Sequence, residues 1–153
     1  MQTAAQPVYR CRMVNKPDTP PESTLRRHLH AHGLRFARRV RDLPGRPELV
    51  LPKRRSVIFV HGCFWHRHDG CPFFRLPKTR TSFWDGKLRR NQERDADNVE
   101  ALAAIGWRVA VVWECGVRPD TAQVTERLGA WLDHDTGSIE RAARDGAVKC
   151  DPL

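Results

Sequence analysis

The fold is decided by an apolar run, Ser56-Val57-Ile58-Phe59-Val60, which leads directly into His61-Gly62-Cys63-Phe64-Trp65-His66-Arg67-His68-Asp69-Gly70-Cys71. A continuous apolar run of this length is typical of a strand that is buried on both faces. The segment after it holds two cysteines and three of the seven histidines of the chain. We therefore predict a central strand that delivers a Cys/His cluster to one edge of a sheet.

A helix is predicted upstream of this strand. Thr19 suits its N-cap, Pro20 suits its first position, and Glu22 completes a capping box with Thr19. Gly33 is expected to end the helix, because glycine readily takes the left-handed conformation found at helix ends.

Three further strands are expected over residues 34–40, 48–51 and 107–113. Short turns link the first two to the central strand, which predicts an antiparallel meander. A basic loop and a long helix from Ser82 to about Ile105 separate the central strand from 107–113, and such a crossover permits parallel pairing. We therefore expect an α/β fold with a mixed sheet flanked by helices.

The chain is divided into three predicted parts. Residues 1–18 are interpreted as a basic arm, 19–132 as the folded domain and 133–153 as a C-terminal tail without assigned structure or weakly helical. A helix over 119–132 closes the domain. A length of 153 residues is most simply one domain.

The composition favours a polyanionic partner. The chain has 27 Lys and Arg against 18 Asp and Glu, which gives a net charge of +9. Such a charge favours nucleic acid over an anionic membrane. No apolar run reaches the roughly 18 residues of a membrane span, and the first twelve residues lack the apolar core of a secretory signal. We therefore expect a cytoplasmic, nucleoid-associated protein that does not bind membranes.

A metal site is predicted from the cysteines. Their odd number, five, argues against a disulfide scaffold, and Cys11 and Cys150 are interpreted as free thiols. Cys63, His68 and Cys71 are spaced like ligands on one loop. Cys115, at the end of the last strand, could supply a fourth ligand, and four S or N ligands suit structural Zn²⁺. Spacing alone leaves open which of the histidines at 61, 66 and 68 is the ligand, and buried apolar cysteines are the alternative.

Two carboxylates and a histidine are candidates for catalysis. Glu48 lies at the start of a short strand, where it could hold Mg²⁺ together with phosphate oxygens. His66, if it is not a metal ligand, could act as general base or acid, and Glu22 could orient its ring. The alternatives are a solvated carboxylate for Glu48 and the capping role alone for Glu22.

Aromatic side chains accompany the basic residues. Phe64 and Trp65 lie within the polar Cys/His loop, and Trp84 begins the long helix just after a basic loop. Apolar wedges surrounded by Lys and Arg unstack and bend DNA. Core packing is the alternative for each of them.

Several segments in the same order resemble the very short patch repair (Vsr) DNA mismatch endonucleases. They are Leu43-Pro-Gly-Arg-Pro-Glu48, Val57-Ile-Phe-Val-His-Gly-Cys-Phe-Trp-His66, Thr79-Arg-Thr-Ser-Phe-Trp84 with Lys87, Asn91, Arg94 and Asp95, Gly106-Trp-Arg-Val109, and Val112-Trp-Glu-Cys115. The resemblance covers roughly residues 10–132 and implies a restriction-endonuclease-like fold. It also implies a strand-specific nick 5′ to the T of a T·G mismatch, which arises when 5-methylcytosine deaminates.

The resemblance further implies roles for individual residues. The implied zinc ligands are Cys63, His68, Cys71 and Cys115. The implied catalytic residue is His66, supported by Glu22 and His61, while Glu48 and the backbone carbonyl of Val60 hold Mg²⁺. The implied DNA-binding residues are the wedge Phe64, Trp65 and Trp84, together with Lys87, Asn91 and Arg94.

Two positions depart from the family pattern. Glu48 stands where the family usually has Asp, and its longer side chain could weaken or shift a Mg²⁺ site, or favour Mn²⁺. Asp69-Gly70 makes the spacing between His68 and Cys71 one residue longer than in some relatives, and a glycine there makes the longer loop tolerable.

Three alternative functions remain at this point. They are a zinc-stapled mismatch-binding protein without catalysis, a related nuclease with another lesion specificity, and a metal-stabilised protein-interaction module. We expect a monomer, and mismatch-repair proteins are further candidate partners.

Overall fold

The computed structural model describes residues 19–38, 40–133 and 147–148. The predicted basic arm over residues 1–18 and most of the predicted tail over 133–153 lie outside these residues, as do Cys11 and Cys150. Among the described residues, no helix is both long and apolar enough to cross a membrane.

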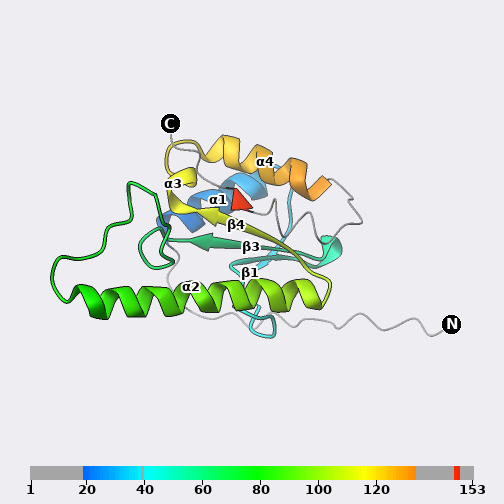
Figure 1. Ribbon diagram of the computed structural model, residues 1–153. Helices are drawn as coiled ribbons and strands as arrows, with labels where there is room; N and C mark the ends of the chain where they lie inside the picture. Colours follow the sequence, from blue (N-terminus) through cyan, green and yellow to red (C-terminus); the bar gives the residue numbers. More distant parts are fainter. Residues whose placement is uncertain (1–18, 39, 134–146, 149–153) are drawn as a thin grey trace.

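A five-stranded mixed sheet, counted over the described residues, forms the centre of the protein (Figure 1). Its strands lie in the order β1 (Ala37–Arg38), β2 (Leu49–Leu51), β3 (Ser56–His61), β4 (Arg108–Trp113) and β5 (Ala147–Val148). The pairs β1–β2 and β2–β3 are antiparallel, whereas β3–β4 and β4–β5 are parallel. The predicted mixed sheet, with its antiparallel meander and parallel crossover, is therefore confirmed.

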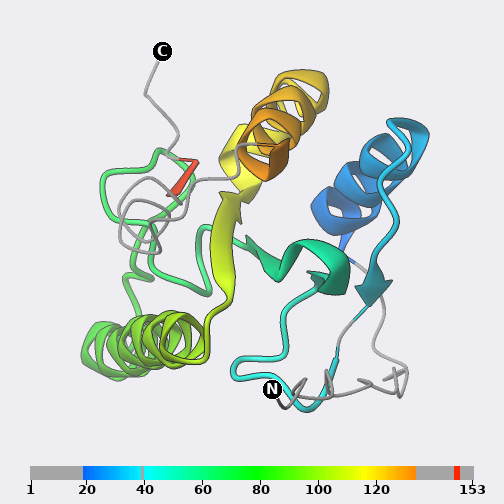
Figure 2. The same ribbon diagram turned by 90° about the vertical axis from the view of Figure 1, so that its right-hand side faces the viewer.

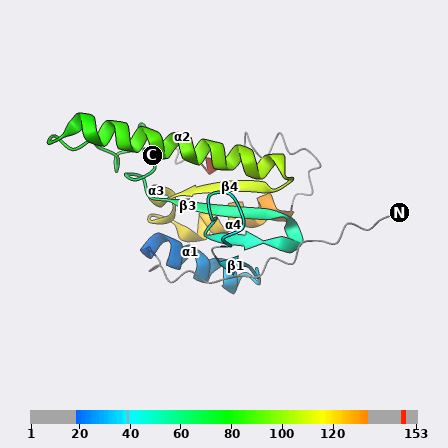
Figure 3. The same ribbon diagram turned by 90° about the horizontal axis from the view of Figure 1, so that it is seen from below.

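Helices cover both faces of the sheet, as two further directions of view show (Figures 2 and 3). α2 (Thr81–Ala104) lies along one face, and α1 (Pro20–Ala31) and α4 (Thr121–Asp133) lie on the other. Two short helices, η1 (Pro52–Arg54) and α3 (Glu114–Val117), follow β2 and β4.

The central strand, β3, is buried along its whole length because it contributes to a core on each face of the sheet. Ile58 and Val60 belong to the core beneath α1 and α4, whereas Val57 and Phe59 belong to the core beneath α2. Side chains alternate between the two faces of a strand, so His61 points to the same face as Phe59. This alternation places His61 beneath α2.

Two predictions near the N-terminal side of the domain are wrong in detail. The strand expected over 34–40 is reduced to Ala37–Arg38, because its partner β2 has only three residues before Pro52, which has no N–H to continue the ladder. The capping box is absent, since the Thr19 side chain makes no capping hydrogen bond and Glu22 is buried. Pro21 also lacks the N–H of the second helical position, one of the two that an N-cap side chain can bind.

The segment after β4 also differs from expectation. Residues 114–117 form a helical turn that the sequence did not predict. α4 begins at Thr121 rather than at Pro119, and Asp120 Oδ1 accepts a hydrogen bond of 2.9 Å from the Gln123 N–H, as an N-cap residue does. β5 lies in a segment for which no strand was expected.

Candidate active site and metal centre

The carboxyl ends of β3 and β4 bring two segments far apart in sequence together. Their parallel register pairs His61 with Trp113, so the residues that follow each strand leave the sheet side by side. Cys63 follows β3, and Cys115 follows β4. Four side chains, Cys63, His68, Cys71 and Cys115, have possible ligand atoms within 4.8 Å of one another. This cluster could hold a metal ion.

The chemistry of this Cys/His cluster suits a metal with S and N ligands. All three cysteines are buried and outside any disulfide, and the Sγ atom of Cys115 lies 3.4 Å from Nδ1 of His68. Burial raises the pKa of Cys63 and lowers the pKa of His68. A bound cation would offset the first shift and would use the neutral imidazole that the second favours. His68 is the histidine that joins the cysteines, which spacing alone left open.

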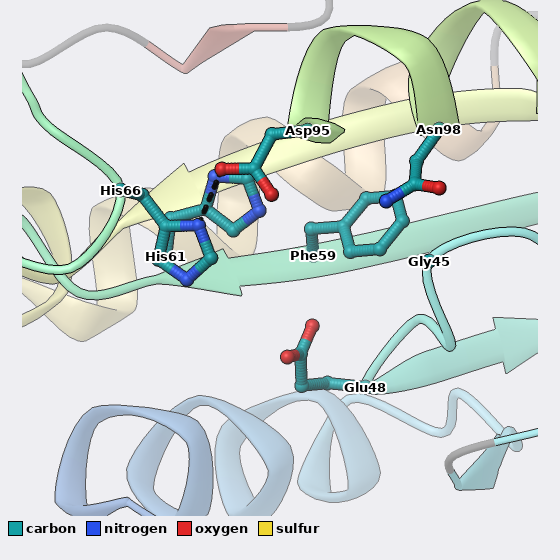
Figure 4. Close-up of a pocket in the computed structure, with 7 residues that line it drawn as sticks. All are labelled: Gly45, Glu48, Phe59, His61, His66, Asp95 and Asn98. Carbon is teal, nitrogen blue, oxygen red and sulfur yellow. Dashed lines mark hydrogen bonds and ion pairs between the residues drawn. The ribbon is translucent and has the colours of Figure 1, made fainter. Parts of the chain in front are cut away.

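A pocket lies beside this cluster, between the sheet and α2 (Figure 4). The loop before β2 and strand β3 form one side, and α2 contributes Asp95 and Asn98 on the other. Its lining residues are Gly45, Glu48, Phe59, His61, His66, Asp95 and Asn98. The expected pair of Glu48 and His66 therefore shares one pocket.

Glu48 presents a carboxylate to this pocket from the residue before β2. Its Oε2 atom accepts a hydrogen bond of 3.0 Å from the backbone N–H of Val60. Burial nevertheless raises the pKa of Glu48 to about 7, and the nearby carboxylate of Glu22 acts in the same direction. A carboxylate under such a desolvation penalty gains free energy when a divalent cation binds to it.

His66 is held from two sides. Its Nδ1 atom lies 2.5 Å from Oδ2 of Asp95, and its ring stacks on His61 with centroids 3.9 Å apart and planes at 4°. A carboxylate only accepts hydrogen bonds when ionised, so Nδ1 of His66 carries a proton, and in the neutral ring Nε2 then keeps its lone pair. Burial lowers the pKa of His61 to about 3, which keeps that ring neutral at pH 7. The arrangement suits His66 as a general base.

Asp95 is the residue of this pocket whose role sequence reasoning missed. We expected Glu22 to orient His66, whereas the structure places Asp95 on the ring and Glu22 in the first turn of α1, close to Glu48. The available signal was a run of polar positions, Asn91 and Asp95, on the helix stripe between Leu88 and Leu102. Polar residues on the face that a helix turns to a sheet need a partner there.

The three aromatic residues that we expected to form a wedge lie together. The rings of Phe64 and Trp84 have centroids 5.7 Å apart, and those of Trp65 and Trp84 are 6.2 Å apart, in edge-on orientations. Trp65 remains 52% exposed. Lys87 places its Nζ atom 5.7 Å and 5.3 Å from the ring centroids of Trp65 and Trp84. The Cys/His loop and the start of α2 therefore share one aromatic, basic surface.

Two residues that we expected to contact DNA are also engaged within the protein. The Asn91 amide donates a hydrogen bond of 3.0 Å to the backbone carbonyl of Trp65. Arg94 in turn donates a hydrogen bond of 2.9 Å to the Asn91 side chain. These contacts connect the exposed tryptophan to the third and fourth turns of α2.

Comparisons with known proteins point to one family. A family profile described as DNA mismatch endonuclease Vsr matches residues 3–72, which include Glu48 and the segment from His61 to Cys71. The type II nicking enzyme V.XorIIP of Xanthomonas oryzae pv. oryzae is 47% identical over 125 residues, which are 82% of this chain and 90% of that relative.

Two further relatives are similar over most of their length. The DNA mismatch endonuclease Vsr of Escherichia coli is 44% identical over 128 residues, or 80% of this chain and 81% of that relative. The type II nicking enzyme V.NmeAIP of Neisseria meningitidis is 39% identical over 115 residues, or 75% and 81% of the two chains.

Proposed function

Because the chain belongs to the Vsr family of DNA mismatch endonucleases, we propose that it nicks a DNA duplex on the 5′ side of the T in a T·G mispair. Such mispairs arise from deamination of 5-methylcytosine, and the nick would initiate very short patch repair. The observation that carries this proposal is the pocket in which the His66–Asp95 pair faces Glu48, directly beside the exposed aromatic surface. One chain supplies every group, so we propose a monomer that acts on chromosomal DNA in the cytoplasm.

In this proposal Glu48 and the backbone carbonyl of Val60 would hold Mg²⁺. The donors are oxygen atoms, as Mg²⁺ prefers, and the raised pKa of Glu48 marks a carboxylate that lacks sufficient solvation. When bound, the ion would supply charge neutralisation at the scissile phosphate and at the leaving 3′ oxygen. Glu22 adds negative charge behind Glu48, which favours a cation there.

His66 acts as the base. Its Nε2 atom takes a proton from the attacking water as the new O–P bond forms and the P–O3′ bond breaks. Asp95 holds the Nδ1 proton and stabilises the imidazolium that results, and the stacked His61 ring limits rotation of His66. The leaving O3′ atom needs a proton to become a hydroxyl group, and a solvent water molecule can donate it.

The Cys/His cluster is the proposed zinc site. Three cysteine sulfurs and one imidazole are the ligand types of a structural zinc site, and four such ligands would complete the coordination of the ion. The ion would fasten the loop that carries Phe64, Trp65 and His66 to the ends of β3 and β4. Its proposed role is to hold the reactive histidine and the wedge in place.

DNA recognition is assigned to the aromatic surface. Phe64, Trp65 and Trp84 would enter the duplex beside the mispair, and Lys87, Asn91 and Arg94 would contact the strands. A mispair is easier to unstack than a paired step, so insertion costs less free energy there. The net charge of +9 supplies attraction that does not depend on sequence.

The test is a nicking assay. A labelled duplex with one T·G mispair, placed in several methyltransferase-type sequence contexts, is incubated with the protein beside its paired C·G counterpart, in Mg²⁺ and in Mn²⁺. We expect a nick 5′ to the T that is missing from the paired duplex and from His66→Ala. Mismatch binding without a nick in either metal would instead favour a DNA-binding protein whose cleavage activity is lost because Glu48 stands where the family usually has Asp. In that case we expect Glu48→Asp to restore cleavage.

A further inference from the structure

The segment Trp65–Asp69 carries three functions within five residues. Trp65 belongs to the exposed aromatic surface, His66 to the catalytic pocket and His68 to the Cys/His cluster. Arg67 lies between the two histidines and has a φ angle of +49°, in the left-handed region that favours glycine. A strained residue at such a position persists only where its surroundings hold it.

The surroundings of Arg67 are well defined. Its Nη1 atom donates a hydrogen bond of 2.6 Å to Oδ1 of Asp85 in the first turns of α2, and its Nε atom lies 3.4 Å from Asp69. The guanidinium also lies 5.7 Å from the ring centroid of Phe74. Its side chain is only 12% exposed, so Arg67 points into the protein.

Asp85 is adjacent to Trp84, as Arg67 is two residues from Trp65. The ion pair therefore joins the two backbone segments that supply the two tryptophans. The Arg67 and Arg89 guanidinium groups hold the pKa of Asp85 below its usual value, so the carboxylate stays ionised at neutral pH. Gln92 adds a weaker link from α2, with its amide 3.4 Å from the Arg67 carbonyl.

We propose that Arg67 and Asp85 are positioning residues that hold Trp65 and Trp84 in their DNA-binding arrangement before DNA binds. The proposal rests on the proposed function, in that it assigns the aromatic surface to mismatch recognition. Side chains that must be ordered during binding reduce affinity through lost conformational entropy, and an aromatic surface that is already formed avoids this loss. The pair would act on affinity for mismatched DNA through the tryptophans and not through contact with the substrate.

A purely electrostatic role makes a different prediction. If the pair acted only through its charges, Asp85→Asn would strengthen DNA binding by removing a negative charge, and Arg67→Gln would weaken it. Positioning predicts that both substitutions weaken binding to the mismatched duplex. The sign of the Asp85→Asn effect therefore separates the two explanations.

The experiment compares Arg67→Gln, Asp85→Asn and the double variant with Arg89→Gln as the matched control. Arg89 is the other ion-pair partner of Asp85, and its side chain is 62% exposed. Arg89→Gln therefore removes one positive charge beside the same carboxylate. Dissociation constants are measured without Mg²⁺ for a T·G duplex and its paired counterpart. We expect each single variant to weaken T·G binding about three- to tenfold, the double variant to add little, and the control to stay within about twofold.

A second readout uses the protein without DNA. The circular-dichroism couplet of neighbouring indoles reports the arrangement of Trp65 and Trp84, and zinc content reports the integrity of the Cys/His loop. We expect a reduced couplet with full zinc content in Asp85→Asn and an unchanged couplet in Arg89→Gln. Should Arg67→Gln lose zinc, Asp85→Asn decides the question, because Asp85 lies outside the metal-binding loop.

Two outcomes have distinct meanings. Unchanged or tighter T·G binding by Asp85→Asn, with an unchanged couplet, would overturn the positioning role. A wild-type protein that does not prefer the T·G duplex would refute the proposed function, and the couplet would still show whether the ion pair holds the two tryptophans.

Discussion

At the scale of single residues, the pocket joins groups with opposite electrostatic preferences. Burial disfavours the ionised form of Glu48, which a nearby cation would stabilise, whereas an anion stabilises the His66 ring when it takes a proton. Asp95 meets the second preference at 2.5 Å. The separation of these two roles within one pocket agrees with the metal-assisted hydrolysis that we propose.

Asp95→Asn should lower the rate of nicking by about 10²- to 10⁴-fold, because an amide stabilises a protonated His66 poorly and permits the wrong tautomer. The structure of the wedge is untouched by this change, so the dissociation constant for the T·G duplex should stay within about twofold. Single-turnover nicking and equilibrium binding measure the two quantities separately. A loss of binding equal to the loss of rate would refute the assignment of Asp95 to His66 alone.

Glu48→Gln should change the pH dependence of stability. The pKa of Glu48 rises from 4.5 to about 7 on folding, so the native state holds more protons between these values and stability falls as pH increases. The substituted amide cannot titrate, and its oxygen can still accept the Val60 hydrogen bond. Without divalent cations and above pH 7, the free energy of unfolding of the variant should therefore exceed that of the wild type by up to about 3 kcal/mol. This difference should vanish near pH 4.5, and denaturant titrations at both pH values measure it.

The same comparison contains its own control. Added Mg²⁺ should stabilise the wild type at pH 8 and leave Glu48→Gln unaffected, since only the carboxylate binds the ion strongly. Equal stabilisation of both proteins would place the Mg²⁺ site elsewhere.

At the scale of elements, the ends of β3 and β4 and the start of α2 act as one unit. The parallel pairing of β3 with β4 sets Cys63 beside Cys115, and contacts from α2 hold the intervening loop. His68 also stacks on Trp113, with ring centroids 4.0 Å apart. Loss of a metal ion from this cluster should therefore disorder the loop before it unfolds the sheet.

If the Cys/His cluster holds zinc as we propose, Cys115→Ser should release the ion and disorder the loop from Cys63 to Cys71, because the binding free energy of a structural zinc ion is also folding free energy. We expect loss of hydrogen-exchange protection in the loop, a lower unfolding temperature and loss of mismatch binding. Asp95→Asn serves as the comparison, since it should leave zinc content and protection unchanged. Full protection of the loop in zinc-free Cys115→Ser would contradict a structural role for the ion.

At the scale of the whole molecule, charge should govern how tightly any DNA is held. With a net charge of +9, binding should weaken steeply with salt, at a slope of roughly −0.9 per phosphate neutralised. Lys87→Gln should reduce that slope by about one, and it should also weaken T·G binding more than paired binding, because Lys87 lies over both tryptophan rings. Salt titrations on the two duplexes test both statements, and an unchanged slope would remove Lys87 from the phosphate contacts.

Much of this architecture was predictable from local pattern. The apolar run at 56–60 needed burial on both faces, the stripe from Trp84 to Leu102 needed a helix, and Gly33 and Gly106 take the left-handed conformations expected after helices. These features depend on residues that are close together in sequence, so the sequence alone predicts them. The position of Cys115 beside Cys63 followed from topology, because a helical crossover allows parallel strands to end together.

Sequence pattern was sufficient for the central strand, the long helix, the mixed sheet and the clustering of Cys and His after β3. The contacts between polar side chains needed the folded chain. The contact of Asp95 with His66, the pairing of Arg67 with Asp85 and the position of Glu22 near Glu48 became known only from the packed structure. Local periodicity shows which side of a helix is apolar, whereas the partner of a polar side chain depends on how far that helix slides and rotates against the sheet, and packing between distant segments sets that position.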